Sequence, residues 1–143
     1  NDNNNTDLKF ITENHNNIFL KMDIEGGEYP WLLSVDESFL KNFKQIVIEF
    51  HGINDDTWGC SLVNKIKCLE KLSNTHYIIH AHPNNNGDIK DGIPDVIELT
   101  YVNKSYFNDI PAYNSTEFPL KDLDFPNKPS KRDITINHAP FVQ

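Results

Sequence analysis

The sequence predicts an α/β domain in which parallel strands joined by helices are followed by an antiparallel hairpin. Apolar runs at residues 18–24 and 45–50 are typical of strands buried on both faces, and helical patterns separate them. The link between the last two strand patterns, residues 88–95, is too short for a crossover helix, so that pair is antiparallel. The 143 residues, 38% of them hydrophobic, suffice for one domain with its own core, spanning residues 1–143.

The first predicted strand begins at Ile18 and ends in a charged turn. Its apolar residues give way to Asp23 and Glu25, and the chain then breaks at two glycines. Such a strand delivers its last side chains to the rim of the sheet, where α/β proteins bind ligands. On an extended backbone the two carboxylates project to the same side. Asp23 and Glu25 are therefore candidate catalytic residues that orient a hydroxyl, take its proton or help to hold a cation.

Polar and helical segments flank this strand. Residues 1–6 have nothing to bury and are expected to form a mobile leader. Pro30 suits the first turn of a helix, and Asp36 suits the N-cap of the next one. Glu28 lies at a helix N-terminus, where unpaired N–H groups favour a carboxylate, so we expect it to contribute mainly to stability.

The second predicted strand ends in Glu49 and His51, which share one side. Parallel neighbours end at the same edge of a sheet, so these side chains should come within several ångströms of Asp23. A histidine with a carboxylate alongside is a credible base for removing a hydroxyl proton. Glu49 and His51 therefore join the candidate catalytic residues, with a purely structural hydrogen bond between them as the alternative.

A polar loop and an amphipathic helix follow. Trp58 stands in the loop and is available to stack on a ligand as a substrate-binding residue. In the helix predicted at residues 61–72, Ile66 belongs to the apolar stripe and Lys65 to the mostly opposite charged face. Cys60 and Cys68 give no disulfide framework, and a reduced compartment fits them.

The third predicted strand, residues 77–82, carries His80 and His82 on one side. This spacing can present two imidazoles to one metal ion, with Asp23, Glu49 or His51 completing a mixed oxygen and nitrogen site. The alternative is that both histidines are polar residues with ordinary hydrogen-bond partners.

An asparagine-rich turn and a proline-rich tail complete the chain. Asn84, Asn85 and Asn86 are candidate contacts to a sugar-like acceptor, although such a turn is also ordinary loop chemistry. Residues 103–143 contain five prolines and are predicted to form an extended tail with at most one short strand, at residues 134–136.

The charge of the chain bears on its partners. A net charge of −8 and a pI near 5.1 argue against a nucleic-acid backbone or an anionic membrane surface as the main partner. No apolar stretch approaches the roughly 20 residues that cross a bilayer. We therefore expect a cytoplasmic protein that acts on a small molecule or a glycan.

Four segments carry a family resemblance. They read LKMDIEGGE, IVIEFHG, HYIIHAHPNNNG and IPDVIELTYVNK. In this order they resemble the C-terminal half of the FkbM-like S-adenosylmethionine-dependent methyltransferases, over roughly residues 7–130. The resemblance implies part of a Rossmann-like class I methyltransferase sheet, with the last strand inserted between the second and third. It also implies S-adenosylmethionine as cofactor and methyl transfer to a hydroxyl of a sugar or small metabolite.

The resemblance also shows what this stretch lacks. Such enzymes cradle the cofactor with a glycine-rich turn after their first strand and an acidic residue after their second, and nothing before Ile18 supplies either. The cofactor-binding residues therefore stay unassigned. The strand before Asp23 would be left as an exposed apolar edge, which we expect to pair with a missing N-terminal segment or another chain.

Three functions are consistent with these features. The leading hypothesis is an O-methyltransferase-like domain that supplies the acceptor side of the site. Its possible cofactors are S-adenosylmethionine and, in addition, a divalent metal ion. The alternatives are a non-catalytic binding or scaffolding module built on this half-fold, and a metal-dependent hydrolase that uses the two histidines of the third strand.

Overall fold

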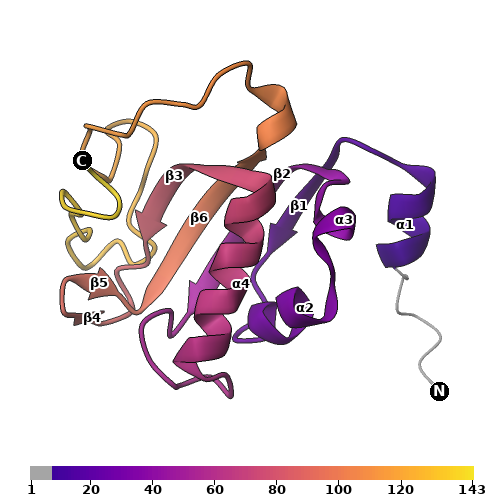
Figure 1. Cartoon of the computed structure of the whole chain (residues 1–143). Helices are drawn as coiled ribbons and strands as arrows, with labels where there is room; N and C mark the ends of the chain where they lie inside the picture. Colours follow the sequence, from indigo (N-terminus) through magenta and orange to yellow (C-terminus); the bar gives the residue numbers. More distant parts are fainter. Residues whose placement is uncertain (1–7) are drawn as a thin grey trace.

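A computed structural model of the chain describes residues 8–143, and its centre is a mixed four-stranded sheet (Figure 1). The strand order is β1-β2-β6-β3. β1 (Ile18–Met22) and β2 (Phe43–His51) run parallel, and β6 (Val96–Asn103) is antiparallel to both β2 and β3 (His76–Pro83). The predicted α/β class, the closing antiparallel pair and the inserted last strand are confirmed.

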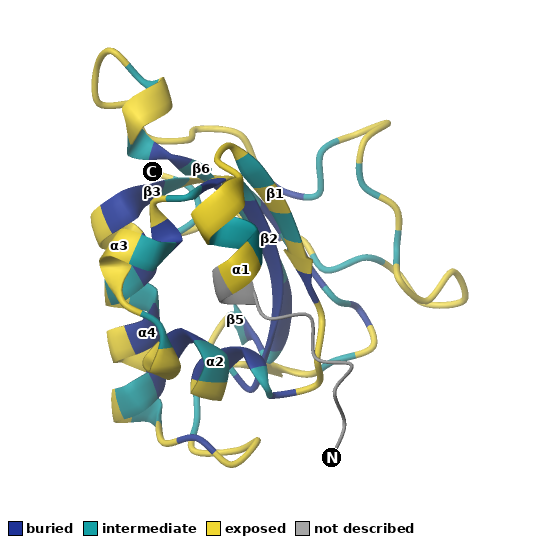
Figure 2. Cartoon of the chain, turned by 90° about the vertical axis from the view of Figure 1, so that its right-hand side faces the viewer, coloured by how far each residue is buried: buried dark blue, intermediate teal, exposed yellow. Residues whose placement is uncertain are grey.

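Helices cover one face of the sheet (Figure 2). They are α2 (Glu28–Ser34), α3 (Glu37–Leu40) and α4 (Leu62–Thr75), and α1 (Leu8–Asn14) precedes β1. The predicted cap at Asp36 is present, because its carboxylate accepts a hydrogen bond of 2.8 Å from the backbone N–H of Phe39. The leader expected at residues 1–6 lies outside the described residues.

The register of the strands determines which residues lie at the rim of the sheet. Met22 pairs with Ile48 in the parallel ladder, so the residue after Met22 emerges beside Glu49. In the antiparallel ladder His51 pairs with Val96, so the start of β6 reaches the same rim. Among the described strands β1 is paired on one side alone, as expected of an edge strand.

The core lies between the helices and the sheet. Its fully buried members come from α2, α3, α4, β2 and β6; they include Leu32, Leu40, Phe43, Ile46, Ile48, Phe50, Leu72, Ile97 and Tyr101. Cys60 and Cys68 are both buried and unpaired.

The predicted orientation of α4 was wrong at two positions. Lys65 is fully buried, and Ile66 is 47% exposed. The Lys65 ammonium is satisfied inside, because it donates to the carbonyl oxygen of Gly52 and lies 4.9 Å from the ring centroid of Tyr29. A specific acceptor at the end of β2 therefore outweighs the apolar periodicity of the helix.

The C-terminal segment lies against the face of the sheet opposite the helices. It follows the small hairpin of β4 (Ile89–Lys90) and β5 (Ile93–Pro94), strand β6 and the 3₁₀ turn η1 (Lys104–Tyr106). Phe118 and Ile136 are buried there and form an isolated antiparallel bridge, so a single bridge stands where at most one short strand was expected, at residues 134–136. None of the described helices is long and apolar enough to cross a membrane.

A buried histidine gives the fold a pH dependence. His76 lies 3.0 Å from the carbonyl oxygen of Phe43 and 2.7 Å from the Thr75 hydroxyl. Burial, and to a smaller extent the charge of Lys104, lowers its pKa below 6.5, the value for an exposed imidazole. Below that value the unfolded chain binds more protons at this residue than the folded one, so the free energy of unfolding should fall as pH falls through it.

Urea unfolding at about pH 7.5 and about pH 5.5 measures this effect. The decrease in the free energy of unfolding between the two pH values should be smaller in His76→Gln than in the wild type. The exposed His15 provides the control, because His15→Gln should keep the full decrease. Equal decreases in the wild type and His76→Gln would contradict the assignment.

Candidate functional site

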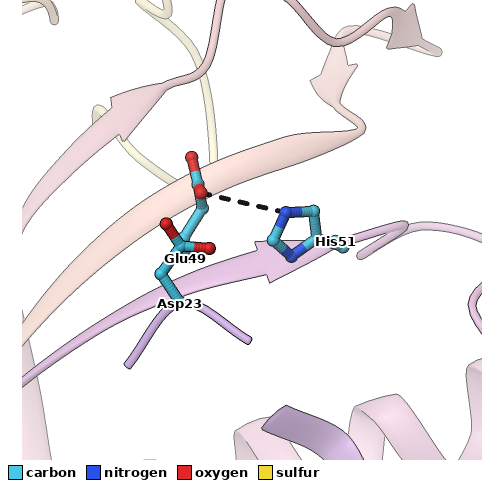
Figure 3. A group of neighbouring side chains, drawn as sticks. All are labelled: Asp23, Glu49 and His51. Atoms are coloured by element: carbon cyan, nitrogen blue, oxygen red, sulfur yellow. Dashed lines mark ion pairs between the residues drawn. The ribbon is translucent and has the colours of Figure 1, made fainter. Parts of the chain in front are cut away.

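Three side chains meet where β1 and β2 end (Figure 3). One ligand atom each of Asp23, Glu49 and His51 lies within 4.8 Å of the other two. Glu49 and His51 are among the last three residues of β2 and are 8% and 4% exposed, whereas Asp23 follows β1 and is exposed. The structure thus brings together the strand-end residues as their parallel register predicts, and their catalytic roles stay a prediction.

A buried carboxylate orients the imidazole of His51. The Glu28 Oε1 atom accepts a hydrogen bond of 2.9 Å from the backbone N–H of His51 and lies 3.1 Å from its Nδ1. The other oxygen, Oε2, accepts from the N–H of Gly26 at 2.9 Å. With Nδ1 donating to Glu28, the lone pair of a neutral ring is on Nε2, which faces the rim.

Two further carboxylates face that Nε2 atom. It lies 3.4 Å from Glu25 Oε2 and 3.8 Å from Glu49 Oε2. Both separations exceed those of ordinary hydrogen bonds. The expected extended backbone does not continue to Glu25, whose φ of 54° places it in a left-handed turn, and its side chain is 73% exposed. The turn nevertheless brings the Glu25 carboxylate to the cluster.

Glu49 is the buried acid of the group. Burial raises the pKa of its carboxyl, and the neighbouring Asp23 raises it further, whereas an Asn84 hydrogen bond and His51 oppose the shift. The Asn84 bond runs from its amide nitrogen to Glu49 Oε1 at 2.8 Å. Glu49 therefore retains a proton at higher pH than an exposed glutamate.

An open pocket of about 360 Å³ lies beside the cluster. Its lining is mainly polar and consists of Glu25, Glu49, His51, Trp58, Asn84, Asn86, Gly87, Asp88, Asp95 and Val96. Trp58 is 43% exposed, and its ring centroid lies 4.9 Å from that of His51. Trp58 and Asn86 are thus placed where the sequence predicts substrate contacts, and those contacts stay a prediction.

The sequence analysis missed two aspartates of this pocket. Asp88 and Asp95 precede β6, whose start lies opposite the end of β2. The pKa of Asp95 is raised by burial and by the charge of Asp55. A signal for them existed, because an antiparallel strand begins at the rim where its neighbour ends.

Asn85 has a different environment from Asn86. Its amide nitrogen donates to the carbonyl oxygens of Lys128, Lys131 and Arg132 at 3.0–3.3 Å, and its oxygen accepts from the Lys128 N–H at 2.7 Å. These bonds fasten the C-terminal segment to the turn after β3. Acceptor binding by Asn85 stays a prediction, and it would require this buried amide to change partners.

The two histidines of β3 are also engaged by the C-terminal segment. His80 Nε2 lies 3.0 Å from Asp124 Oδ2, and His82 Nε2 lies 3.1 Å from Asp133 Oδ2. In the described part of the chain, the three residues with metal-ligand geometry are Asp23, Glu49 and His51. Neither His80 nor His82 belongs to this group. The predicted metal role of His80 and His82 stays a prediction, and their observed contacts match the alternative of satisfied polar histidines.

Comparison with known proteins identifies the family. The family model described as the methyltransferase FkbM domain matches residues 7–113, which is more than half of the chain. No curated protein and no solved structure matches the sequence. The matched span contains β1, β2, β3 and β6 together with the Asp23, Glu49 and His51 cluster. The chain therefore belongs to the FkbM methyltransferase family.

Proposed function

We propose that this chain supplies the acceptor side of an S-adenosylmethionine-dependent O-methyltransferase that acts on a hydroxyl of a sugar or other small metabolite. The observation that carries the proposal is the convergence of Asp23, Glu49 and His51 on an open polar pocket at the rim of the sheet. Family membership supplies the reaction class.

The pocket suits a polyhydroxylated acceptor. Its amides, at Asn84 and Asn86, and its carboxylates offer donors and acceptors that sugar hydroxyls can pair with. Trp58 offers a partly exposed ring for an apolar sugar face. Methyl transfer needs an aligned oxygen that loses its proton, and positioned acid–base groups typically contribute 10²–10⁴-fold to such a step. The cluster of carboxylates and imidazole performs both tasks.

The described residues do not fit the whole methyl donor. Adenine binding calls for an apolar slot, and Trp58 and Val96 are the apolar side chains in a pocket otherwise lined by glycine, acids, amides and an imidazole. We assign no residue of this stretch to S-adenosylmethionine. We propose instead that a further strand, from another segment or chain, pairs with the free edge of β1 and completes the donor site.

Asp23→Asn tests the proposal, because Asp23 is exposed and its replacement should leave the fold intact. We expect kcat/KM for transfer of a labelled methyl group from S-adenosylmethionine to a panel of sugars to fall by about 10²-fold or more. The assay uses the natural protein that contains this chain, and thermal unfolding checks stability.

Glu98→Gln is the matched control. Glu98 pairs with Lys21 on the same side of the sheet as Glu49 but does not line the pocket, so its loss should leave activity unchanged. A protein that binds sugars without any methyl transfer, or an Asp23→Asn variant with full activity, would overturn the proposed function.

A further inference from the structure

We propose that Asp23, Glu49 and His51 form a binding site for one divalent metal ion of the Mn²⁺ or Zn²⁺ type. The site differs from the histidine pair of β3, since it is built from the ends of β1 and β2. It deepens the proposed function, on which its catalytic consequence rests, but metal binding itself is independent of methyl transfer.

The first argument is the geometry of the three candidate ligands. Their ligand atoms lie within 4.8 Å of one another, a spacing that closes around a single ion with small side-chain adjustments. Asp23 is exposed and free to adjust, whereas Glu49 and His51 are fixed by burial on β2. Two rigid ligands and one adjustable ligand make a partly preformed site.

The second argument is the orientation of His51, which is independent of the acidic cluster. The side chain of His51 is only 6% exposed, and its Nδ1 is occupied by Glu28. No hydrogen bond to Nε2 occurs among the described residues, and the nearest carboxylate oxygen is 3.4 Å away. The lone pair that a neutral ring carries on Nε2 thus faces the pocket without a hydrogen-bond donor, and a metal ion held together with Asp23 and Glu49 would satisfy it.

Glu28 adds the contact that metal-bound histidines usually make. Such histidines donate their second ring N–H to a carboxylate, a carbonyl or water, which fixes the tautomer and raises ligand basicity. The fully buried Glu28 has this position, and backbone N–H groups of Gly26 and His51 hold it there.

The ligand set indicates the kind of ion. One imidazole with two carboxylates is a mixed nitrogen and oxygen set, suited to Mn²⁺ or Zn²⁺, whereas Mg²⁺ prefers oxygen alone. Three protein ligands leave coordination positions open, as in catalytic sites. In the proposed reaction an acceptor hydroxyl at such a position would lose its proton more easily, and the exposed Glu25 beside Nε2 is placed to receive it.

Calorimetric titration of the purified protein with Mn²⁺, without methyl donor or acceptor, tests the site directly. We expect one Mn²⁺ per chain and competition by Zn²⁺. Asp23→Asn and the near-isosteric Glu49→Gln should each weaken binding at least tenfold, and electron paramagnetic resonance of bound Mn²⁺ should lose its signal in parallel. Circular dichroism confirms that both variants are folded.

Asp88→Asn is the control for general acidity, because Asp88 lines the same pocket outside the three-residue group. Its affinity for Mn²⁺ should match that of the wild type. A wild type that does not bind Mn²⁺ or Zn²⁺ stoichiometrically would overturn the proposal, and so would an equal loss in Asp88→Asn. Intact metal binding without methyl transfer would contradict the proposed function alone.

Discussion

Replacement of Glu28 by alanine is expected to lower the free energy of unfolding by about 3–5 kcal/mol, because three buried groups lose their acceptor at a cost of about 1–3 kcal/mol each. The Glu28 carboxylate is fully buried and accepts from the backbone N–H groups of Gly26 and His51, and it also contacts His51 Nδ1. Alanine would leave these groups buried without an acceptor, and this loss is the source of the expected destabilisation.

Urea unfolding of Glu28→Ala and Glu25→Ala, analysed by linear extrapolation, provides the measurement. Glu25 is the matched control, because it is a carboxylate in the same turn that also contacts the His51 ring but is 73% exposed. Its replacement should change the free energy of unfolding by no more than about 0.5 kcal/mol. Similar values for the two variants would show that water replaces Glu28 without cost.

The strand pattern of the sequence was sufficient to predict the four strands of the main sheet. β1 and β2 are recognised from their apolar runs. The link at residues 88–95, between β3 and β6, is too short for a helix, so β3 and β6 are antiparallel. The order of the strands in the sheet, however, cannot be read from any single segment of the sequence. The position of β6 between β2 and β3 was expected from the family resemblance, and neither length nor periodicity of β6 encodes it.

Side chains with distant partners were the ones that sequence reasoning misjudged. Asp23, Glu49 and His51 were found because each ends one of two parallel strands, a property visible along the chain. Lys65 was placed on the solvent face because its acceptor, the Gly52 carbonyl, is 13 residues away. Glu28 was expected to stabilise a helix end, and its bond with His51 across 23 residues was not foreseen.

Gly52→Ala is expected to lower the free energy of unfolding by about 2–4 kcal/mol, through backbone strain and overpacking together. Gly52 has a φ of 59°, which L-residues rarely adopt. An added Cβ would lie 2.2 Å from Thr57 Oγ1, 2.5 Å from Trp58 Cδ1 and 3.0 Å from Lys65 Nζ. The substitution would therefore displace Trp58 from His51 and disturb the buried bond of Lys65 to the Gly52 carbonyl.

Gly59→Ala separates the two causes. Gly59 has a similar φ of 68°, but no atom lies within 4 Å of the position of its added Cβ. It should therefore show the strain alone, about 1–2 kcal/mol. The difference between the two variants measures the clash, and a change in tryptophan fluorescence in Gly52→Ala alone would report movement of Trp58. Equal losses would mean that the loop relaxes freely, and that close packing against Gly52 does not hold Trp58 in its place beside the pocket.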